Sequence, residues 1–234
     1  MDEEEGSQIL NLETYRTVLV ERRLMLAALV ATAIGAVTFV VAVATCQWSI
    51  VHFETADGAG VVEIHLGIWG EWHTDEYGGT RNVTWIPHFP SPPAHDVRLS
   101  SDDLLYYYRA QALFATMTLL AMAGTLALAV YCFACEHRFS YKRMAACFHV
   151  ITAMLLAVTI ESLLFSTSLW KDAESGAARA YETRAGLATY WSWALFGLYL
   201  CASVVFLVGS RKRKGSLAAT TRYERHDRPV QLGR

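Results

Sequence analysis

Four long runs of the chain contain almost no charged residue, and they constrain the fold more than any other feature. They cover approximately residues 24–46, 110–133, 144–166 and 190–210, and the third contains one acid, Glu161. About 20 mostly apolar residues in a helix cross a hydrocarbon core of roughly 30 Å. Lipid offers no hydrogen-bond partner to the backbone, so each run has to be helical. The sequence therefore predicts an all-α membrane protein whose four transmembrane helices form one domain, residues 24–210.

Positive charges near the ends of these runs predict the orientation of the chain. They gather in the N-terminal segment 1–23, in the short loop between the second and third runs, and in the basic tail 211–234. Lys and Arg in short loops mark the cytoplasmic side of a membrane. We therefore expect a plasma-membrane protein with both termini in the cytoplasm and with loops 47–109 and 167–189 outside. The first run is too long for a signal-peptide core, so we expect it to be retained.

The loop 47–109 predicts a small β-sheet. Four apolar residues alternate with more polar ones, as is typical of a strand buried on one face: Val62, Ile64, Leu66 and Ile68. Segments 48–51 and 82–85 are candidate partner strands, and 75–79, with two glycines, is a candidate turn. A helix that starts near residue 101 should continue into the second run, so its first two turns should project beyond the membrane.

The same loop contains five of the eight histidines, which allow two interpretations: His52, His65, His73, His88 and His95. Imidazoles can form a pH-sensitive or zinc-binding surface. The spacings match no metal template, so we favour scattered, exposed side chains. We predict no metal site and no cofactor.

Asn82-Val83-Thr84 is an acceptor sequence for N-glycosylation. Such acceptors are used in loops that lie outside the cell, which agrees with the orientation expected from the positive charges. The sequence therefore predicts a glycoprotein modified at Asn82.

Several short motifs carry a resemblance to a known family. They are Trp48 after the first run, His65-Leu66-Gly67-Ile68-Trp69 in the loop, Arg109 at the start of the second run, Ile160-Glu161 in the third, and Tyr190-Trp191-Ser192-Trp193 opening the fourth. With these motifs the chain resembles the superfamily of claudins, peripheral myelin proteins and voltage-dependent calcium-channel γ subunits, and it is most similar to the γ-like members. The resemblance implies a left-handed four-helix bundle capped by an extracellular antiparallel sheet of about five strands, and no catalysis.

The chain departs from this family at one position. The family follows its Gly-Leu-Trp stretch with a Cys that pairs with a second Cys of the loop, whereas Trp69 is followed here by Gly70, and no Cys follows Cys46 in the loop. A disulfide typically contributes about 2–4 kcal/mol. The sheet must therefore be held by packing, for which Trp72 and Trp85 are candidates.

Two charged residues lie near the outer ends of neighbouring runs. An ionisable residue within a membrane span is expensive to bury and is a candidate for function. Because Arg109 and Glu161 belong to the same leaflet, we expect them to form an ion pair. The pair could lock the two helices together, which we favour, or contact a membrane helix of a partner.

Three cysteines lie near the cytoplasmic ends of the second and third runs: Cys132, Cys135 and Cys147. They are candidates for palmitoylation. The alternative, which we favour, is that they are reduced thiols in a helical core.

Two functions of different kinds fit the sequence. The first is an auxiliary, γ-like subunit that modulates the gating or trafficking of a cation channel. The alternative is a claudin-like protein of cell junctions that sets paracellular permeability. The expected partners are the lipid bilayer and a channel pore subunit or other membrane proteins, including a second copy. We expect no enzymatic activity, no nucleic acid and no small-molecule substrate, because the chain contains no paired acids, nucleophile–base motif or phosphate loop.

Overall fold

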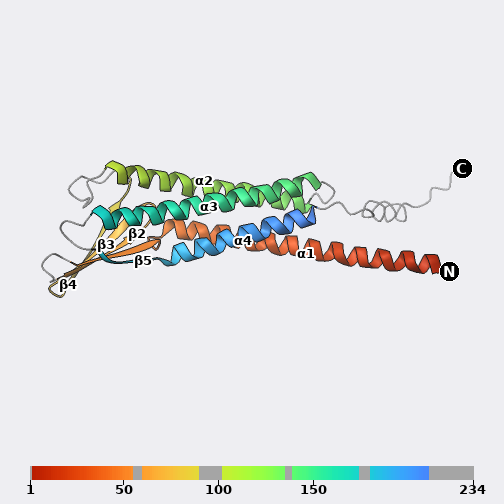
Figure 1. The fold of residues 1–234 in the computed structure, drawn as a ribbon, viewed down its shortest axis with the longest axis horizontal. Coiled ribbons are helices and arrows are strands. Elements are labelled where there is room, and N and C mark those ends of the chain that lie inside the picture. Colours follow the sequence, from red (N-terminus) through yellow and green to blue (C-terminus); the bar gives the residue numbers. More distant parts are fainter. Residues whose placement is uncertain (1, 55–59, 90–101, 135–138, 174–179, 211–234) are drawn as a thin grey trace.

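The computed structural model describes residues 2–54, 60–89, 102–134, 139–173 and 180–210, and it contains four long helices and one small sheet (Figure 1). The helices are α1 (Asp2–Ala44), α2 (Asp102–Ala134), α3 (Phe139–Ala173) and α4 (Leu187–Gly209). Each includes a stretch that is long and apolar enough to cross a membrane, namely Leu19–Ala44, Tyr106–Phe133, Ser140–Ser168 and Leu187–Gly209. The prediction of four membrane-spanning helices is thus confirmed in length and composition.

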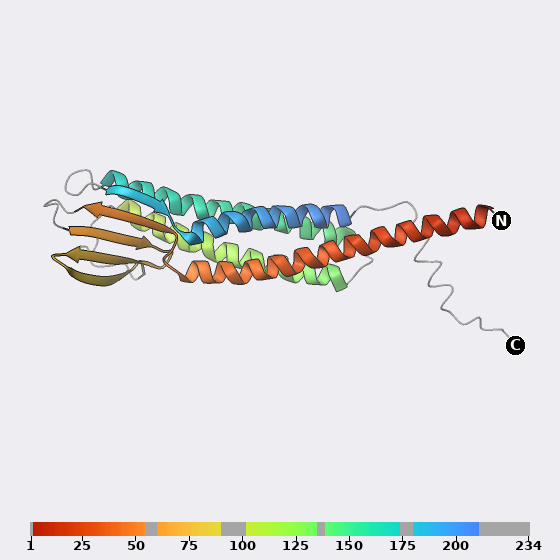
Figure 2. The same cartoon turned by 90° about the horizontal axis from the view of Figure 1, so that it is seen from below.

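The four helices lie side by side and form a bundle. Helices α1 and α3 each pack against both α2 and α4. The sheet lies at one end of the bundle, which we call the sheet end, and α1 extends beyond the other helices at the opposite end (Figure 2). At the sheet end, α2 and α3 continue alongside the strands (Figure 1). The helix predicted to start near residue 101 is therefore confirmed as α2, which starts at Asp102.

Hydroxyl groups link the helices inside the bundle. Thr118 of α2 lies 3.1 Å from Thr159 of α3, and Thr125 lies 2.8 Å from Thr152, oxygen to oxygen. Ser203 of α4 donates a hydrogen bond to the carbonyl oxygen of Ala146 on α3, at 2.9 Å. The hydrophobic effect does not drive helices together in lipid, so small residues and hydroxyl groups are typical of contacts between helices there. These bonds fix how α2, α3 and α4 are aligned along their length.

The sheet has five antiparallel strands in the order β4-β3-β2-β1-β5. They are β1 (Ser49–Glu54), β2 (Gly60–Leu66), β3 (Gly70–Tyr77), β4 (Thr80–Pro87) and β5 (Ala180–Ala185). The strand predicted from alternation is β2, and the two candidate partner strands are β1 and β4. The predicted turn is confirmed between β3 and β4, where Gly78 and Gly79 have φ angles of 57° and 83°, a conformation that glycine adopts at little cost. Strands β3 and β5 were not predicted.

The two faces of the sheet differ in burial. The inner face packs against α2, and five of its residues form a buried cluster with Tyr108 of that helix: Val51, Phe53, Val62, Ile64 and Leu66. The outer face carries the alternate residues of each strand, most of them partly or fully exposed. Strand β4 is exposed along most of its length because it is an edge strand. One face of the sheet therefore forms a core with the helices, and the other face is on the surface of the molecule.

Candidate functional site

Trp48 joins the sheet to the bundle. Its side chain is fully buried, and the indole Nε1 donates a hydrogen bond to the carbonyl oxygen of Ala42 at 2.8 Å. Its ring packs edge-on against Phe39 with 6.3 Å between centroids. Its backbone also bonds to β2 through Leu66 and to the start of α4 through Gly186. Trp48 is therefore a structural residue at the point where all these elements meet.

The Gly67-Ile68-Trp69 motif forms the tight connection between β2 and β3. The amide of Gly67 donates to the carbonyl oxygen of Gly70 at 3.0 Å. A Cβ atom on Gly67 would lie 2.6 Å from the Sγ of Cys46, so a larger residue would not fit without movement. Ile68 is fully buried, whereas Trp69 is 42% exposed and contacts Phe89. The first two residues of the motif thus pack where the sheet meets the bundle, and the third is exposed on the surface.

Trp85 packs closely against Gly70, the residue that follows Trp69. A Cβ atom on Gly70 would overlap the indole ring of Trp85, which lies directly over the glycine. Of the two tryptophans expected to pack the sheet, Trp85 is therefore the one that fills the space beside Gly70. The four cysteines in the described ranges, Cys46 among them, form no disulfide. Burial and the nearby charge of Glu71 raise the pKa of Cys46 to about 11, so its thiol is neutral.

Four polar side chains meet in the interior between the sheet and α2, and we call them the acid–imidazole cluster: Glu71, His73, His88 and Tyr108. The Oε1 of Glu71 lies 2.8 Å from the Nε2 of His73, and the Tyr108 hydroxyl donates to its Oε2 at 3.2 Å. The Nε2 of His88 lies 3.5 Å from Oε2, which is too long for a well-formed hydrogen bond. The ring of His88 stacks on Tyr108, and its Nδ1 lies 3.1 Å from the carbonyl oxygen of Ile68.

Glu71 is ionised in this environment. Burial on its own would raise its pKa, but the hydrogen bond with His73 and the electrostatic attraction of the imidazoles of His73 and His88 outweigh this effect and hold the pKa below its usual range. A buried carboxylate is tolerated only when it is paired and hydrogen-bonded. The cluster therefore ties β3, the segment after β4, and α2 to one buried charge. Together with Trp48 it explains how the sheet is held without a loop disulfide.

The expectation that the five histidines of loop 47–109 are exposed was wrong for two of them, because His73 is only 5% and His88 only 1% exposed. His73 points inward because its register partner on β2 is the buried Ile64. His52 and His65 lie on the outer face, 3.5 and 3.1 Å from Glu63. His95 lies outside the described residues. Within the described part of the chain, no group of three His, Cys, Asp or Glu residues is arranged to hold a metal ion.

Arg109 and Glu161 do not form the predicted ion pair. Both side chains are exposed, and within the ranges that the structure describes no ion pair joins them. Gln111 of α2 donates to the carbonyl oxygen of Ser162 on α3, so the two charges lie at nearly the same level on neighbouring helices. The bond between Ser203 and Ala146 shows which residues of α3 and α4 lie at the same level. Because the two helices are antiparallel, Glu161, fifteen residues after Ala146, lies level with the first turn of α4. Glu161 thus lies on the surface of the bundle, close to the sheet end.

The remaining predicted residues lie in different surroundings. Asn82 is exposed on the edge strand β4, as an acceptor for a glycan has to be. Cys132 is 2% exposed, which disfavours acylation, whereas Cys147 is exposed on α3 near its start. Cys135 lies outside the described residues. Of the palmitoylation candidates, Cys147 is therefore the one that the fold leaves accessible.

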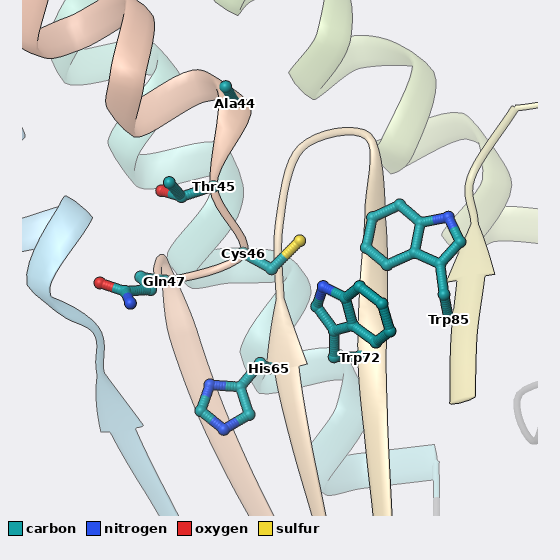
Figure 3. A pocket seen from close by; sticks show the side chains of 7 residues that line it. All are labelled: Ala44, Thr45, Cys46, Gln47, His65, Trp72 and Trp85. Carbon is teal, nitrogen blue, oxygen red and sulfur yellow. The ribbon is translucent and has the colours of Figure 1, made fainter. Parts of the chain in front are cut away.

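A hollow of about 620 Å³ lies between the end of α1 and the outer face of the sheet (Figure 3). It is lined by Ala44, Thr45, Cys46, Gln47, His65, Trp72 and Trp85. Trp72 and Trp85 are register partners on β3 and β4, and their ring centroids are 5.0 Å apart with 50° between the planes. The two indoles are side by side in Figure 3, and the thiol of Cys46 points toward them.

These features divide the sheet end into a buried part and a presented part. Trp48 and the acid–imidazole cluster hold the sheet on the bundle. Glu161, Arg109 and the hollow lined by Trp72 and Trp85 face outward. The chain matches no family model and no curated protein sequence.

Proposed function

We propose that this chain is a non-enzymatic, γ-like auxiliary subunit that modulates the gating or trafficking of a cation channel in the plasma membrane. In this proposal the fold is a claudin-like left-handed bundle, both termini are cytoplasmic, and the sheet lies outside the cell. The observation that carries the proposal is Glu161, an acid on the surface of a membrane-spanning helix with no partner from its own chain among the described residues.

The surface around Glu161 is otherwise apolar. The outward residues of α3 recur every three or four positions and are between 40% and 57% exposed: Ile151, Met154, Val158 and Phe165. Glu161 lies in the same stripe, between Val158 and Phe165. The corresponding stripe of α2 contains Arg109 and the exposed Leu113. One acid and one base near the same end of two apolar helix faces form a pattern that a membrane helix of a partner can match.

The free-energy cost of an unpaired acid in a membrane favours contact of Glu161 with a partner protein over contact with lipid. An acidic side chain deep in a span costs at least about 2.5 kcal/mol, and less toward the boundary. A pore subunit that supplies a cation or a hydrogen-bond donor at this level would recover that cost. Since 1.4 kcal/mol corresponds to a factor of ten, one such contact is worth on the order of ten- to a hundredfold in affinity.

A claudin-like junction protein is the second candidate, and one observation favours it. Strand β4 is an exposed edge strand with free backbone groups on one side. Exposed edges readily pair with a strand of another molecule. In this alternative a second copy on the same or a neighbouring cell would extend the sheet at β4. Direct self-association through β4 would then be the basis of cell contact.

The test is affinity purification of the tagged full-length protein in mild detergent, followed by mass spectrometry. We expect a pore-forming channel subunit in near-stoichiometric amount. In Glu161→Gln, which keeps the size of the side chain, the yield of that subunit should fall about tenfold. The matched control is Glu54→Gln, an exposed acid on the sheet, which should leave the yield unchanged.

Two results would refute the auxiliary role. One is recovery of the chain alone or with junctional proteins, which would move the junction candidate to first place. The other is an equal channel yield for wild type and Glu161→Gln, which would show that the α3 surface is not the contact. Localisation in adhesion-poor cells separates the candidates further, because a junction protein concentrates at cell contacts without any channel.

A further inference from the structure

The hollow beside α1 lies where a bilayer would end on the side of the sheet. Its floor is Ala44–Gln47, and Ala44 is the last residue of the membrane-spanning stretch of α1. Within two turns of this point, Val37, Val40 and Val41 of α1 are between 52% and 66% exposed, as lipid-facing residues are. The hollow is thus continuous with a lipid-facing helix surface. The molecules closest to its opening are lipids of this leaflet, and their headgroups are at its level.

Two indole rings supply the main recognition surface of the hollow. Trp72 is 43% and Trp85 38% exposed, although such large aromatic side chains are normally well buried. Their rings are adjacent and tilted by 50°, so they do not cover each other's faces as stacked rings would. A cation within about 6 Å of the centroid of an indole is attracted by the ring, and Trp is the strongest of the aromatic residues in this respect. The pair can therefore receive one cationic group.

The charges around the hollow favour a cation over an anion. Among the described residues that line it there is no Lys or Arg, and His65 contacts the carboxylate of Glu63 at 3.1 Å. The arginines described on this face are Arg81, four residues along β4 from Trp85, and Arg184 on β5, three strands from Trp72. Strand spacing and rise place them about 13–14 Å away, beyond a screening length of roughly 8 Å. Arg184 is also paired with Glu182.

The occupant should be a cation that requires few hydrogen bonds, because the faces of the two indole rings offer it electrostatic attraction and no hydrogen-bond acceptor. A quaternary ammonium fits this description, and its recognition by aromatic residues is a known use of the cation–π interaction. We propose that Trp72 and Trp85 bind the choline group of a phosphatidylcholine molecule from the leaflet on the sheet side. This site does not depend on the proposed channel partner, nor on which side of the membrane faces the cytoplasm.

Native mass spectrometry of the full-length protein in mild detergent tests the proposal. The probes are phosphatidylcholine, phosphatidylethanolamine and phosphatidylglycerol with identical acyl chains, added in equal amounts. We expect about tenfold more retained phosphatidylcholine than phosphatidylglycerol, and an intermediate value for phosphatidylethanolamine. Tryptophans that merely anchor a protein at the interface would not distinguish these headgroups.

Substitutions locate the site. Trp72→Leu should lower the retained phosphatidylcholine about tenfold and leave phosphatidylglycerol unchanged. The matched control is Trp69→Leu, because Trp69 is equally exposed, at 42%, but does not line the hollow. Trp85→Phe keeps a ring over Gly70 and should lose phosphatidylcholine by a few fold. If Trp72→Leu does not elute as a folded species in size-exclusion chromatography, Trp85→Phe provides the test of the site instead.

Three outcomes would overturn the proposal. The first is equal retention of phosphatidylcholine and phosphatidylglycerol by the wild-type protein. The second is an equal loss of phosphatidylcholine in Trp69→Leu and Trp72→Leu, which would indicate a general interfacial effect. The third is wild-type retention of phosphatidylcholine in folded Trp72→Leu or Trp85→Phe.

Discussion

Replacing Glu71 by Gln tests whether the acid–imidazole cluster holds the sheet on the bundle. The substitution keeps the shape of the side chain but removes its charge. Glu71 is 5% exposed, and its carboxylate receives two close contacts, 2.8 Å from His73 and 3.2 Å from Tyr108. A hydrogen bond to a charged group contributes about 1.5–3 kcal/mol, and a neutral one about 1 kcal/mol. Two contacts therefore lose about 1–4 kcal/mol together when the charge is removed.

The effect should depend on pH in a defined direction. Because the pKa of Glu71 is lowered in the folded protein, the unfolded chain takes up more protons at acidic pH, and stability falls as the pH falls. An unfolded Glu titrates near pH 4.3. The contribution of Glu71 should be fully present above about pH 4.3 and should be lost as the pH falls through the lower pKa of the folded state. Glu71→Gln should lack this dependence.

Hydrogen exchange measured by mass spectrometry reports the opening of the sheet. A loss of about 1–4 kcal/mol corresponds to roughly 5- to 1000-fold faster exchange of the amides of β3 and β4. The matched control is Glu63→Gln on the outer face of β2, which also contacts two histidines but is one-third exposed. Exposed pairs contribute about 0–1 kcal/mol, so the control should change exchange by less than about fivefold. Equal effects of the two substitutions would refute the argument that burial makes the cluster important.

Three further predictions concern the junction and the edge strand. Trp48→Phe removes the indole bond to Ala42 and should lower the stability by about 1–3 kcal/mol in thermal unfolding in detergent, and unchanged unfolding would contradict the role of Trp48. Gly186→Ala places a methyl group against the carbonyl of Gln47 and should reduce the yield of folded protein in size-exclusion chromatography, whereas Gly79→Ala, in an open turn, should reduce it less. Asn82→Gln should abolish a glycosidase-sensitive shift on gels, and a shift that persists would exclude this residue as the acceptor.

The helices and three of the five strands could be predicted because their patterns are local. A charge-free run long enough to cross a bilayer is visible without tertiary information, and all four runs became helices. Strand β2 alternates apolar and polar residues, and the glycines before β4 mark their turn. Strand β3 could not be recognised in this way, because its inward residues include Glu71 and His73. These buried polar residues replace the apolar residues that the inner face of a strand normally carries.

The candidate site was less predictable because its residues are distant in the sequence. Glu71, His88 and Tyr108 meet only after β3, the segment after β4 and α2 have packed together. The pairing of Arg109 with Glu161 failed for a related reason. The sequence indicated their level in the membrane but not which way each helix is rotated, and the bonds between α2 and α3 turn both side chains outward. The sequence named Trp72 and Trp85 as candidates for packing the sheet, but only the folded chain shows that the ring of Trp85 lies over Gly70.

Epitope accessibility in cells tests most directly that this is a four-pass membrane protein with its sheet outside the cell. One epitope is inserted between Gly78 and Gly79, where the surroundings are open, and a second follows residue 234. We expect an antibody to stain the inserted epitope in intact cells and the terminal epitope only after permeabilisation. Staining of the terminal epitope in intact cells, or of the inserted epitope only after permeabilisation, would contradict this arrangement.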